Sequence, residues 1–128
     1  PEAERKLCSL FPNQIVFTYE WPTSIKPFYI WPKNPKKDIS AGFDVLFNGM
    51  EISSGGQRVH IPEILIKQLK SKKLNPDDFK WYVDAFRYGS VVHSGWSIGL
   101  ERFTMALLNL SNIREGTLFP RDRNRLTP

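Results

Sequence analysis

The sequence predicts an α+β fold in which helices flank an antiparallel β-sheet. Residues 14–21 and 42–48 are rich in β-branched and aromatic residues, which favour strands. Asn48-Gly49 ends the second run and is a strong hairpin signal, so a further strand is expected from Met50. Apolar residues spaced three and four apart appear after residue 60, as on one face of a helix. No internal repeat is visible, and this mixture of strands and helices indicates the α+β class.

The remaining elements follow from capping residues, periodicity and loop composition. Helices are expected where a proline or asparagine opens an apolar-faced segment and where acidic residues meet its positive end. The expected helices are residues 1–11, 61–73, 75–88 and 101–110. Short strands are expected at Phe28–Trp31 and 95–100. Residues 32–40 contain two prolines and three lysines, so we expect a mobile loop that does not pack.

Length and composition indicate one compact domain over residues 1–128. Cys8 is the single cysteine, so no internal disulfide can form, and a reducing, cytoplasmic setting is expected. No apolar run is long enough to span a membrane. The net charge of +5 favours polyanionic partners such as ATP or nucleic acid, although the lysines of residues 67–73 are explained more simply as a solvated helix face.

Two carboxylates in the expected hairpin suggest a cation site. Asp44 and Glu51 lie on strands joined by a tight turn, and Ser54 follows close behind. One or two carboxylates with water and substrate phosphate are the usual environment of Mg²⁺ in proteins. The alternative is a solvated hairpin face with no ligand, and the residues alone favour neither reading.

Arg58 and His60 follow the glycine pair Gly55-Gly56, where a small ligand could approach the backbone. A guanidinium there could hold a carboxylate through two hydrogen bonds. The alternatives are an ordinary surface ion pair for Arg58 and a capping or packing role for His60.

Gly95 and Gly99 lie on an expected strand, where glycine is otherwise unfavourable, and Arg102 follows them. A strand cleared of side chains beside a fixed cation could form the floor of a nucleotide site, with Arg102 stacked on a base or reaching a phosphate. A close contact between helix and sheet would also account for the glycines.

Taken together, these segments resemble the aspartyl-tRNA synthetases of archaeal type, which are class II aminoacyl-tRNA synthetases. Gly-x-x-x-Gly-x-Glu-Arg, which starts at Gly95, resembles motif 3 of that class, placed here at residues 95–110. FDVLFNGMEISSGGQRVH looks like the strand pair that precedes it. PEAER, FTYEWPTSIKPFY, LNPDDFKWYVDAFRYG and the tail LFPRDRNRLTP match along the way. The resemblance covers essentially all 128 residues and implies the C-terminal half of a class II catalytic domain.

The resemblance also implies roles for individual residues. Those implied for ATP are Glu51, Ser54, Gly99 and Arg102. Those implied for aspartate are Arg58, with Gly56, His60, His93 and Gly95 around it. Those implied for Mg²⁺, bound together with ATP, are Asp44, Glu51 and Ser54. In such enzymes aspartate is adenylated and then transferred to tRNA by positioning and charge stabilisation.

The sequence departs from the family pattern in several places. The anticodon-binding domain, motif 1 and motif 2 have no counterpart in these residues. Ser97 stands where motif 3 usually has its middle glycine, and Val91, Val92 and Ser94 replace residues that flank the histidine in close relatives. We therefore expect a truncated aspartyl-tRNA synthetase catalytic domain that retains part of the ATP and aspartate site and cannot charge tRNA alone.

Other functions stay open at this stage. The chain could be an interaction module whose exposed sheet is covered by a second copy or by a partner that completes the site. It could also be a related amino-acid-activating enzyme, or bind RNA through its basic tail. Arg58 does not distinguish aspartate from asparagine, because asparagine enzymes of the class carry a similar arginine.

Overall fold

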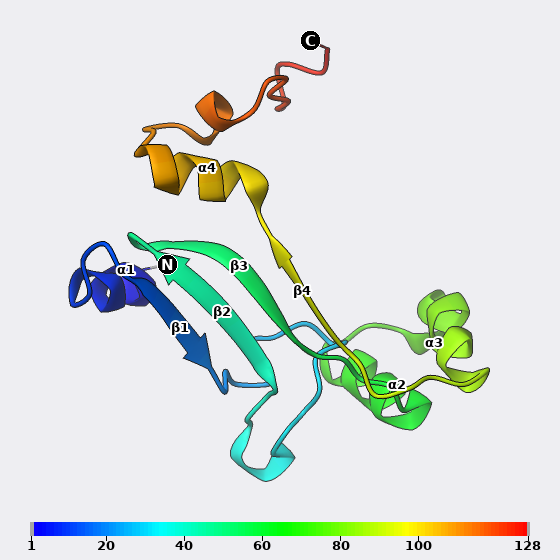
Figure 1. Cartoon of the computed structure of the whole chain (residues 1–128). Coiled ribbons are helices and arrows are strands. Elements are labelled where there is room, and N and C mark those ends of the chain that lie inside the picture. The colour runs from blue at the N-terminus through cyan, green and yellow to red at the C-terminus, as the bar shows by residue number, and fades with distance from the viewer. Residues whose placement is uncertain (1, 128) are drawn as a thin grey trace. The chain divides into compact units, whose positions relative to one another are not determined.

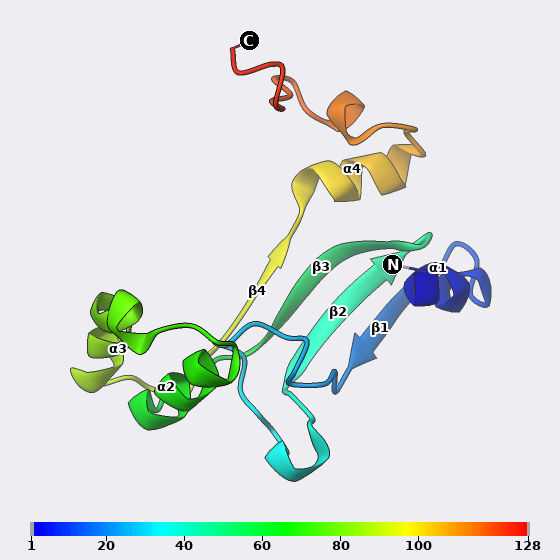
Figure 2. The ribbon, with the colours of Figure 1, turned by 180° about the vertical axis from the view of Figure 1, so that it is seen from behind.

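The computed structural model describes residues 2–127 and contains four strands in one sheet with four α-helices (Figures 1 and 2). The strands are β1 (Ile15–Tyr19), β2 (Gly42–Phe47), β3 (Met50–Gln57) and β4 (Ser94–Ile98). The helices are α1 (Glu2–Ser9), α2 (Pro62–Ser71), α3 (Lys80–Arg87) and α4 (Leu100–Leu108). Short 3₁₀ helices occupy Pro35–Lys37, Pro76–Phe79 and Ile113–Gly116. The α+β prediction is confirmed.

The sheet has the strand order β1-β2-β3-β4, so each strand lies beside its neighbour along the chain. β2 and β3 are joined by Asn48 and Gly49, whose φ angles are 47° and 80°. Positive φ at both positions is the geometry of a two-residue hairpin turn, which asparagine followed by glycine adopts at low cost. This local preference joins the strands that carry Asp44 and Glu51.

The residues group into two compact units. Unit 1 contains the chain up to Thr18, Asp44–Ser54, and the chain from Ser97 onward. Unit 2 contains Tyr19–Phe43 and Gly55–Trp96. Each unit is described by itself below.

The core of unit 2 lies between α2, α3 and the segment after β3. Leu65 and Leu69 of α2 are fully buried, on the face that the periodicity predicted, and pack with Val59 and Val83. Aromatic rings enclose this cluster through edge-to-face contacts; the ring centroids of Phe28 and Phe79, for example, lie 5.3 Å apart. Such contacts add to the stabilisation from apolar burial. The core thus gives the neighbouring strand ends a rigid support.

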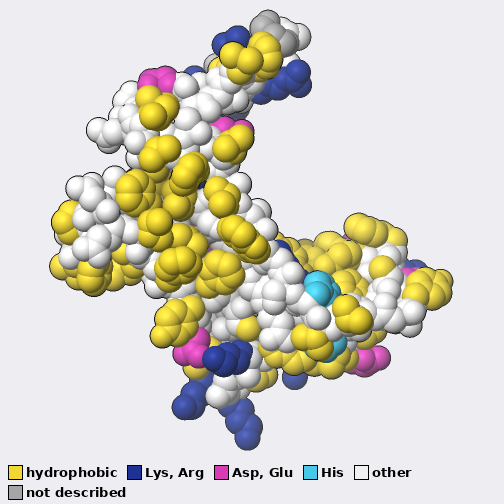
Figure 3. Space-filling view, viewed as in Figure 1, with side chains coloured by type: hydrophobic (Ala, Val, Ile, Leu, Met, Phe, Trp, Pro, Cys, Tyr) yellow, Lys and Arg dark blue, Asp and Glu magenta, His cyan; other side chains and the backbone are white. Residues whose placement is uncertain are grey.

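Unit 1 buries Cys8 of α1, Val45 and Leu46 of β2, and Ile52 of β3. α4 has no buried residue, and Leu107 and Leu108 are 64% and 62% exposed. Further apolar side chains are exposed on β1, and hydrophobic groups gather over this part of the sheet in Figure 3. Apolar surface of this extent is uncommon on monomeric proteins and indicates a contact surface.

Two expectations about unit 2 are wrong. Phe28–Trp31 is not a strand: Phe28 and Tyr29 form a turn, and Ile30 pairs with Arg58 through an isolated bridge. A short aromatic run carries strand propensity, but tertiary context decides whether it pairs.

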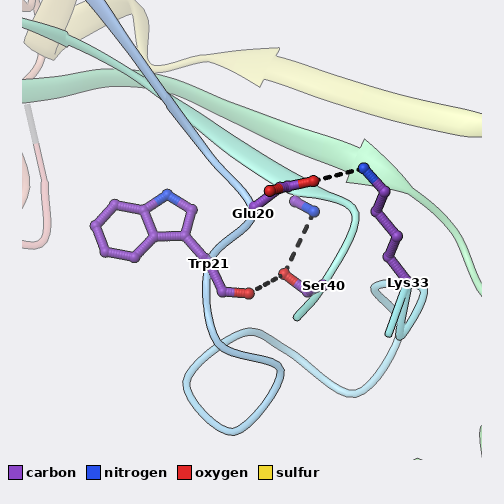
Figure 4. A network of polar contacts seen from close by, with 5 residues as sticks. Glu20, Trp21, Lys33 and Ser40 are labelled. Atoms are coloured by element: carbon purple, nitrogen blue, oxygen red, sulfur yellow. Dashed lines mark hydrogen bonds and ion pairs between the residues drawn. The ribbon is translucent and has the colours of Figure 1, made fainter. Parts of the chain in front are cut away.

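Residues 32–40 are not the unpacked loop that their composition suggested. Asn34 caps the 3₁₀ helix Pro35–Lys37 by accepting a hydrogen bond from the Lys37 N–H. Ser40 is fully buried and donates to the Trp21 carbonyl over 2.7 Å, while Lys33 pairs with Glu20 at 2.6 Å (Figure 4). Polar anchors at both ends therefore hold the segment.

The remaining differences concern the ends of elements. The strand expected at 95–100 is β4, Ser94–Ile98, so Gly99 is not on a strand and instead precedes α4 as its N-cap residue. The expected helix at 75–88 is a 3₁₀ turn followed by α3, and Asn75 caps that turn as expected by accepting from the Asp77 N–H. The first helix ends at Ser9, and the part of its prediction that falls on Pro1 lies outside the described residues. Among residues 2–127, every helix is too short or too polar to cross a bilayer.

Candidate functional site

Arg58 lies in a pocket of about 300 Å³ within unit 2. The pocket is lined by Tyr29, Arg58, Tyr82, His93, Ser94 and Gly95. Backbone contacts set the position of Arg58, because its N–H donates to the His93 carbonyl over 2.9 Å and its backbone pairs with Ile30. The backbone just after β3 therefore places the Arg58 guanidinium in a pocket that Tyr29 and Tyr82 also line.

The guanidinium is positioned by a ring and by a glycine. Its central carbon lies 4.8 Å from the centroid of the Tyr29 ring, within the range of a cation–π contact. A Cβ atom added at Gly95 would lie 3.0 Å from both Nε and Nη2 of Arg58, closer than nearly all real contacts. The missing side chain at Gly95 thus makes room for Arg58. From the sequence we expected Gly95 to let a ligand approach the strand. The structure gives a second reason for the glycine, which is the space that Arg58 needs.

Tyr82 reports the electrostatics of this pocket. Burial raises the pKa of its phenol above the ordinary 10.0, because the anionic phenolate is disfavoured away from water. The positive charge of Arg58 acts in the opposite direction, and Tyr29 adds to the rise in pKa.

We predict that Arg58→Met moves the pKa of Tyr82 further upward. The substitution removes the cation that stabilises the phenolate and leaves the burial in place. A titration of ¹³Cζ-labelled tyrosine by NMR measures this directly. Arg87→Met is the matched control, since Arg87 is paired with Asp84 and is not among the charges that shift the pKa of Tyr82. An unchanged or lowered pKa of Tyr82 in Arg58→Met contradicts the proposed contact.

The other residues that the resemblance assigned to aspartate divide into two groups. His93 lines the pocket beside Gly95; its Nδ1 lies 2.9 Å from the Val91 carbonyl oxygen, and its ring is nearly parallel to that of Phe86. His60 is not part of this lining and stacks on Trp31, with ring centroids 5.0 Å apart.

Gly56 is buried and also lies outside the lining of the Arg58 pocket. A Cβ atom there would lie 2.6 Å from the Ala41 carbonyl oxygen and 2.9 Å from Cα of Gly42. Gly56 therefore permits a close approach of backbone to backbone, and that need accounts for its lack of a side chain.

A second, smaller pocket of about 180 Å³ lies within unit 1. It is lined by Glu51, Ile52, Ser53, Ser54, Ser97, Gly99 and Arg102. Two hydrogen bonds to backbone carbonyls join its walls: the Arg102 side chain donates from Nη1 to the Glu51 carbonyl over 3.2 Å, and the Gly99 N–H donates to the Ile52 carbonyl over 3.0 Å. All four residues that the resemblance assigned to ATP line this one pocket.

Two of the three residues expected to hold a metal ion line the unit 1 pocket. Glu51 and Ser54 line the unit 1 pocket, whereas Asp44 is 5% exposed on β2 and is not among the lining residues. Within residues 2–127, no three His, Cys, Asp or Glu side chains form a cluster that could hold a metal ion by themselves. The Glu51 carboxylate and the Ser54 hydroxyl are oxygen groups of the kind that Mg²⁺ takes, usually with water and phosphate as well. The three-residue metal set stays a prediction.

Sequence reasoning missed several lining residues. Tyr29 and Tyr82 line the Arg58 pocket, and neither was assigned a role in binding from the sequence. Ser53 also lines the unit 1 pocket and donates to the Ser97 carbonyl over 2.8 Å. Only its place in the serine and glycine run at the end of β3 could have suggested this.

This fold is that of a class II synthetase domain: the chain belongs to the family of tRNA synthetases class II (D, K and N), which it matches over residues 2–123. Among proteins of that family it is 52% identical over 112 residues to the aspartate–tRNA(Asp) ligase of Thermoplasma volcanium, an alignment that covers 88% of this chain and 26% of that protein. It is 47% identical over 128 residues to the aspartate–tRNA(Asp/Asn) ligase of Methanothermobacter thermautotrophicus, which covers 100% of this chain and 29% of that protein.

Solved structures agree with these sequence relatives. Aspartyl-tRNA synthetase from Entamoeba histolytica superposes with a TM-score of 0.89 at 42% identity, covering 99% of this chain and 27% of that one. Asparaginyl-tRNA synthetase from Pyrococcus horikoshii, complexed with asparaginyl-adenylate, gives a TM-score of 0.87 at 37% identity, covering 99% and 30%. The chain thus spans less than a third of the length of these relatives. The resemblance to archaeal aspartyl-tRNA synthetases is confirmed.

Proposed function

We propose that this chain provides the C-terminal part of the catalytic domain of an aspartate–tRNA ligase, with a pocket for aspartate and part of a pocket for ATP. The observation that carries the proposal is the setting of Arg58, whose guanidinium lies on the Tyr29 ring in space that Gly95 leaves open. Relatives at about half identity are named as aspartate–tRNA ligases, which supports this reaction over others in the family.

Arg58 would bind the side-chain carboxylate of aspartate. A guanidinium presents two parallel N–H groups, which match the two oxygens of a carboxylate. The half-buried rings of Tyr29 and Tyr82 exclude water from one side, and Coulomb attraction strengthens as the local dielectric constant falls. The pocket of about 300 Å³ has the size expected for a small amino acid.

Arg102, Glu51 and Ser54 would contact one portion of ATP. Arg102 supplies a permanent positive charge for a phosphate or a stacking surface for a base, and Glu51 and Ser54 supply oxygen ligands. Mg²⁺ bound there with ATP would offset phosphate charge. At about 180 Å³ the pocket is smaller than the usual range for ligand sites, so it suits a portion of the nucleotide rather than the whole.

The contribution of these residues to adenylation would be positioning and electrostatic stabilisation. Arg58 would orient aspartate, and Arg102 would balance charge on the nucleotide. The resemblance covers motif 3 but neither motif 1 nor motif 2, so we expect the 128-residue chain alone to bind its ligands weakly without charging tRNA. Removing one stabilising donor from such a site typically costs about a hundredfold in rate or more.

Calorimetry tests the proposal with aspartate, Mg·ATP and both together, and a tRNA-charging assay runs in parallel. The expected result is measurable aspartate binding with no charging by this chain alone. Asparagine is the matched competitor, since it keeps the shape of aspartate and lacks the negative charge on the side chain. No heat with aspartate at millimolar concentration would overturn the proposed pocket, and efficient charging would overturn the expected inactivity.

A second candidate function is supported by the surface of unit 1. Ile15, Phe17, Leu107 and Leu108 are each more than half exposed, and β1 and β4 are the outer strands of the sheet. Such surfaces favour association with a second copy or with a partner chain. Light scattering at micromolar concentration distinguishes the cases: a dimer or larger species supports the interaction module, and a strict monomer argues against self-association.

A further inference from the structure

A larger cavity, separate in its lining from the Arg58 pocket, lies within unit 2 between the 32–40 segment and α2. Its volume is about 600 Å³, which is in the range of small-molecule sites. Part of its wall is apolar, formed by Trp31, Pro32, Pro35 and Ile64. A rigid indole and two proline rings favour a ligand with a compact, ring-shaped apolar body.

Two hydrogen-bonding groups in the lining of this cavity have no partner among the described residues. Gln68 is 8% exposed, and its amide Nε2 lies buried with no acceptor. The hydroxyl Oγ1 of Thr23 is also buried and has no hydrogen-bond partner among the described residues. Buried polar groups without partners are rare and unfavourable, so these two indicate a missing hydrogen-bonding group. The terminal torsion of glutamine is soft, so a small rotation suffices to direct the amide toward a ligand.

The charges around the cavity favour an anion. Lys72 donates to the carbonyls of Thr23 and Ser24, so no carboxylate offsets its charge in those contacts. Lys67 is exposed and has no acceptor among the described residues. Asp38 is the one acid in the lining, and it already accepts from the backbone N–H and the hydroxyl of Ser24. Lys33 also lines the cavity and is paired with Glu20, so the lining side chains carry more positive than negative charge.

We propose that this cavity binds a small anionic ring compound that carries an amide-type group. The ring would lie against the apolar wall, the amide would satisfy Gln68 and Thr23, and the negative charge would face Lys67. Such a group offers both a donor and an acceptor, so it matches either orientation of the glutamine amide. The inference does not depend on the proposed ligase site, because the cavity and the Arg58 pocket share no lining residue.

The test uses 4-carbamoylbenzoate as the probe, with benzoate lacking the amide and benzamide lacking the charge. NMR follows the side-chain NH₂ signals of Gln68 in the ¹⁵N-labelled chain, assigned by their loss in Gln68→Met. A ligand of this size is expected to bind with a dissociation constant of about 1 mM and to shift those signals. Each control compound is expected to bind more weakly than the full probe.

Variants distinguish specific binding in the cavity from nonspecific binding at the surface. Gln68→Met keeps the length and volume of the side chain and should weaken binding of the probe about tenfold. In this variant the backbone amide shifts around the cavity measure binding, because the NH₂ signals are absent. Lys67→Gln is exposed and cannot disturb the core, and it should weaken the probe about threefold. Arg87→Met, at a residue that lies outside the cavity lining, should leave binding of the probe within about twofold. Any one of three results overturns the inference. The Gln68 signals do not shift at a probe concentration 10-fold above about 1 mM, the three compounds bind equally, or aspartate displaces the probe.

Discussion

Replacing Arg58 by methionine is expected to weaken aspartate binding about a hundredfold. Removing a guanidinium from a charge-assisted pair in a partly desolvated pocket costs about 2–5 kcal/mol, and each 1.4 kcal/mol is tenfold in affinity. Methionine keeps the apolar stem of the side chain, so it can still lie against Tyr29. In calorimetry with aspartate, the heat given by the wild-type chain should therefore disappear for this variant at the same concentrations.

Two further variants make the Arg58 result specific. Arg87→Met removes the same charge from α3, where Arg87 forms an exposed pair with Asp84, and should leave aspartate binding within about twofold. Arg58→Lys keeps the charge and loses the paired N–H groups, so it should fall between wild type and Arg58→Met. Aspartate binding that survives Arg58→Met unchanged would place the amino-acid site elsewhere.

Gly56→Ala is expected to destabilise the fold by about 3 kcal/mol. The new Cβ would meet the Ala41 carbonyl oxygen at 2.6 Å and Cα of Gly42 at 2.9 Å. Both are backbone atoms, which cannot move aside as the end of a side chain can, and the hydrogen bond from the Gln57 N–H to the same Ala41 oxygen would distort with them. Overpacking of this kind typically costs about 1–3 kcal/mol or more.

Gly42→Ala is the matched control, because it makes the same change at a site where the Cβ has room. The nearest atoms there are Lys26 Cε and Ser40 Oγ, each at 3.4 Å, which is ordinary contact. Urea unfolding followed by circular dichroism gives both free energies, and the variant at Gly42 should stay within about 1 kcal/mol of wild type. Similar losses in the two variants would show that backbone proximity at Gly56 is not the cause.

Sequence reasoning predicted best where the signal is local. The turn at Asn48 and Gly49, the buried face of α2 and the cap at Asn75 all depend on residues within a few positions of each other. It failed at Phe28–Trp31. These residues favour a strand, but only an isolated bridge, between Ile30 and Arg58, pairs them with another segment. It also failed at residues 32–40, because the burial of Ser40 depends on contacts with Trp21, nearly twenty residues away.

The candidate site shows the same division. Glu51, Ser54, Gly99 and Arg102 were assigned together, and they line one pocket. Arg58, His93 and Gly95 were also assigned together and line another, whereas His60 and Gly56 are packed elsewhere. A motif identifies residues that act together across a family, but it does not separate those that contact a ligand from those that hold the backbone in place.

The sequence by itself determined the fold class, the hairpin, the helix faces and the family, because each depends on local patterns or on motifs in a fixed order. Only the tertiary structure decided that Gly95 makes room for the Arg58 guanidinium, that Gly56 serves backbone packing, and that Tyr29 and Tyr82 enclose a pocket. The physical reason is distance along the chain. These contacts join residues that are not neighbours along the chain, and whether two such residues meet depends on packing that no local pattern encodes.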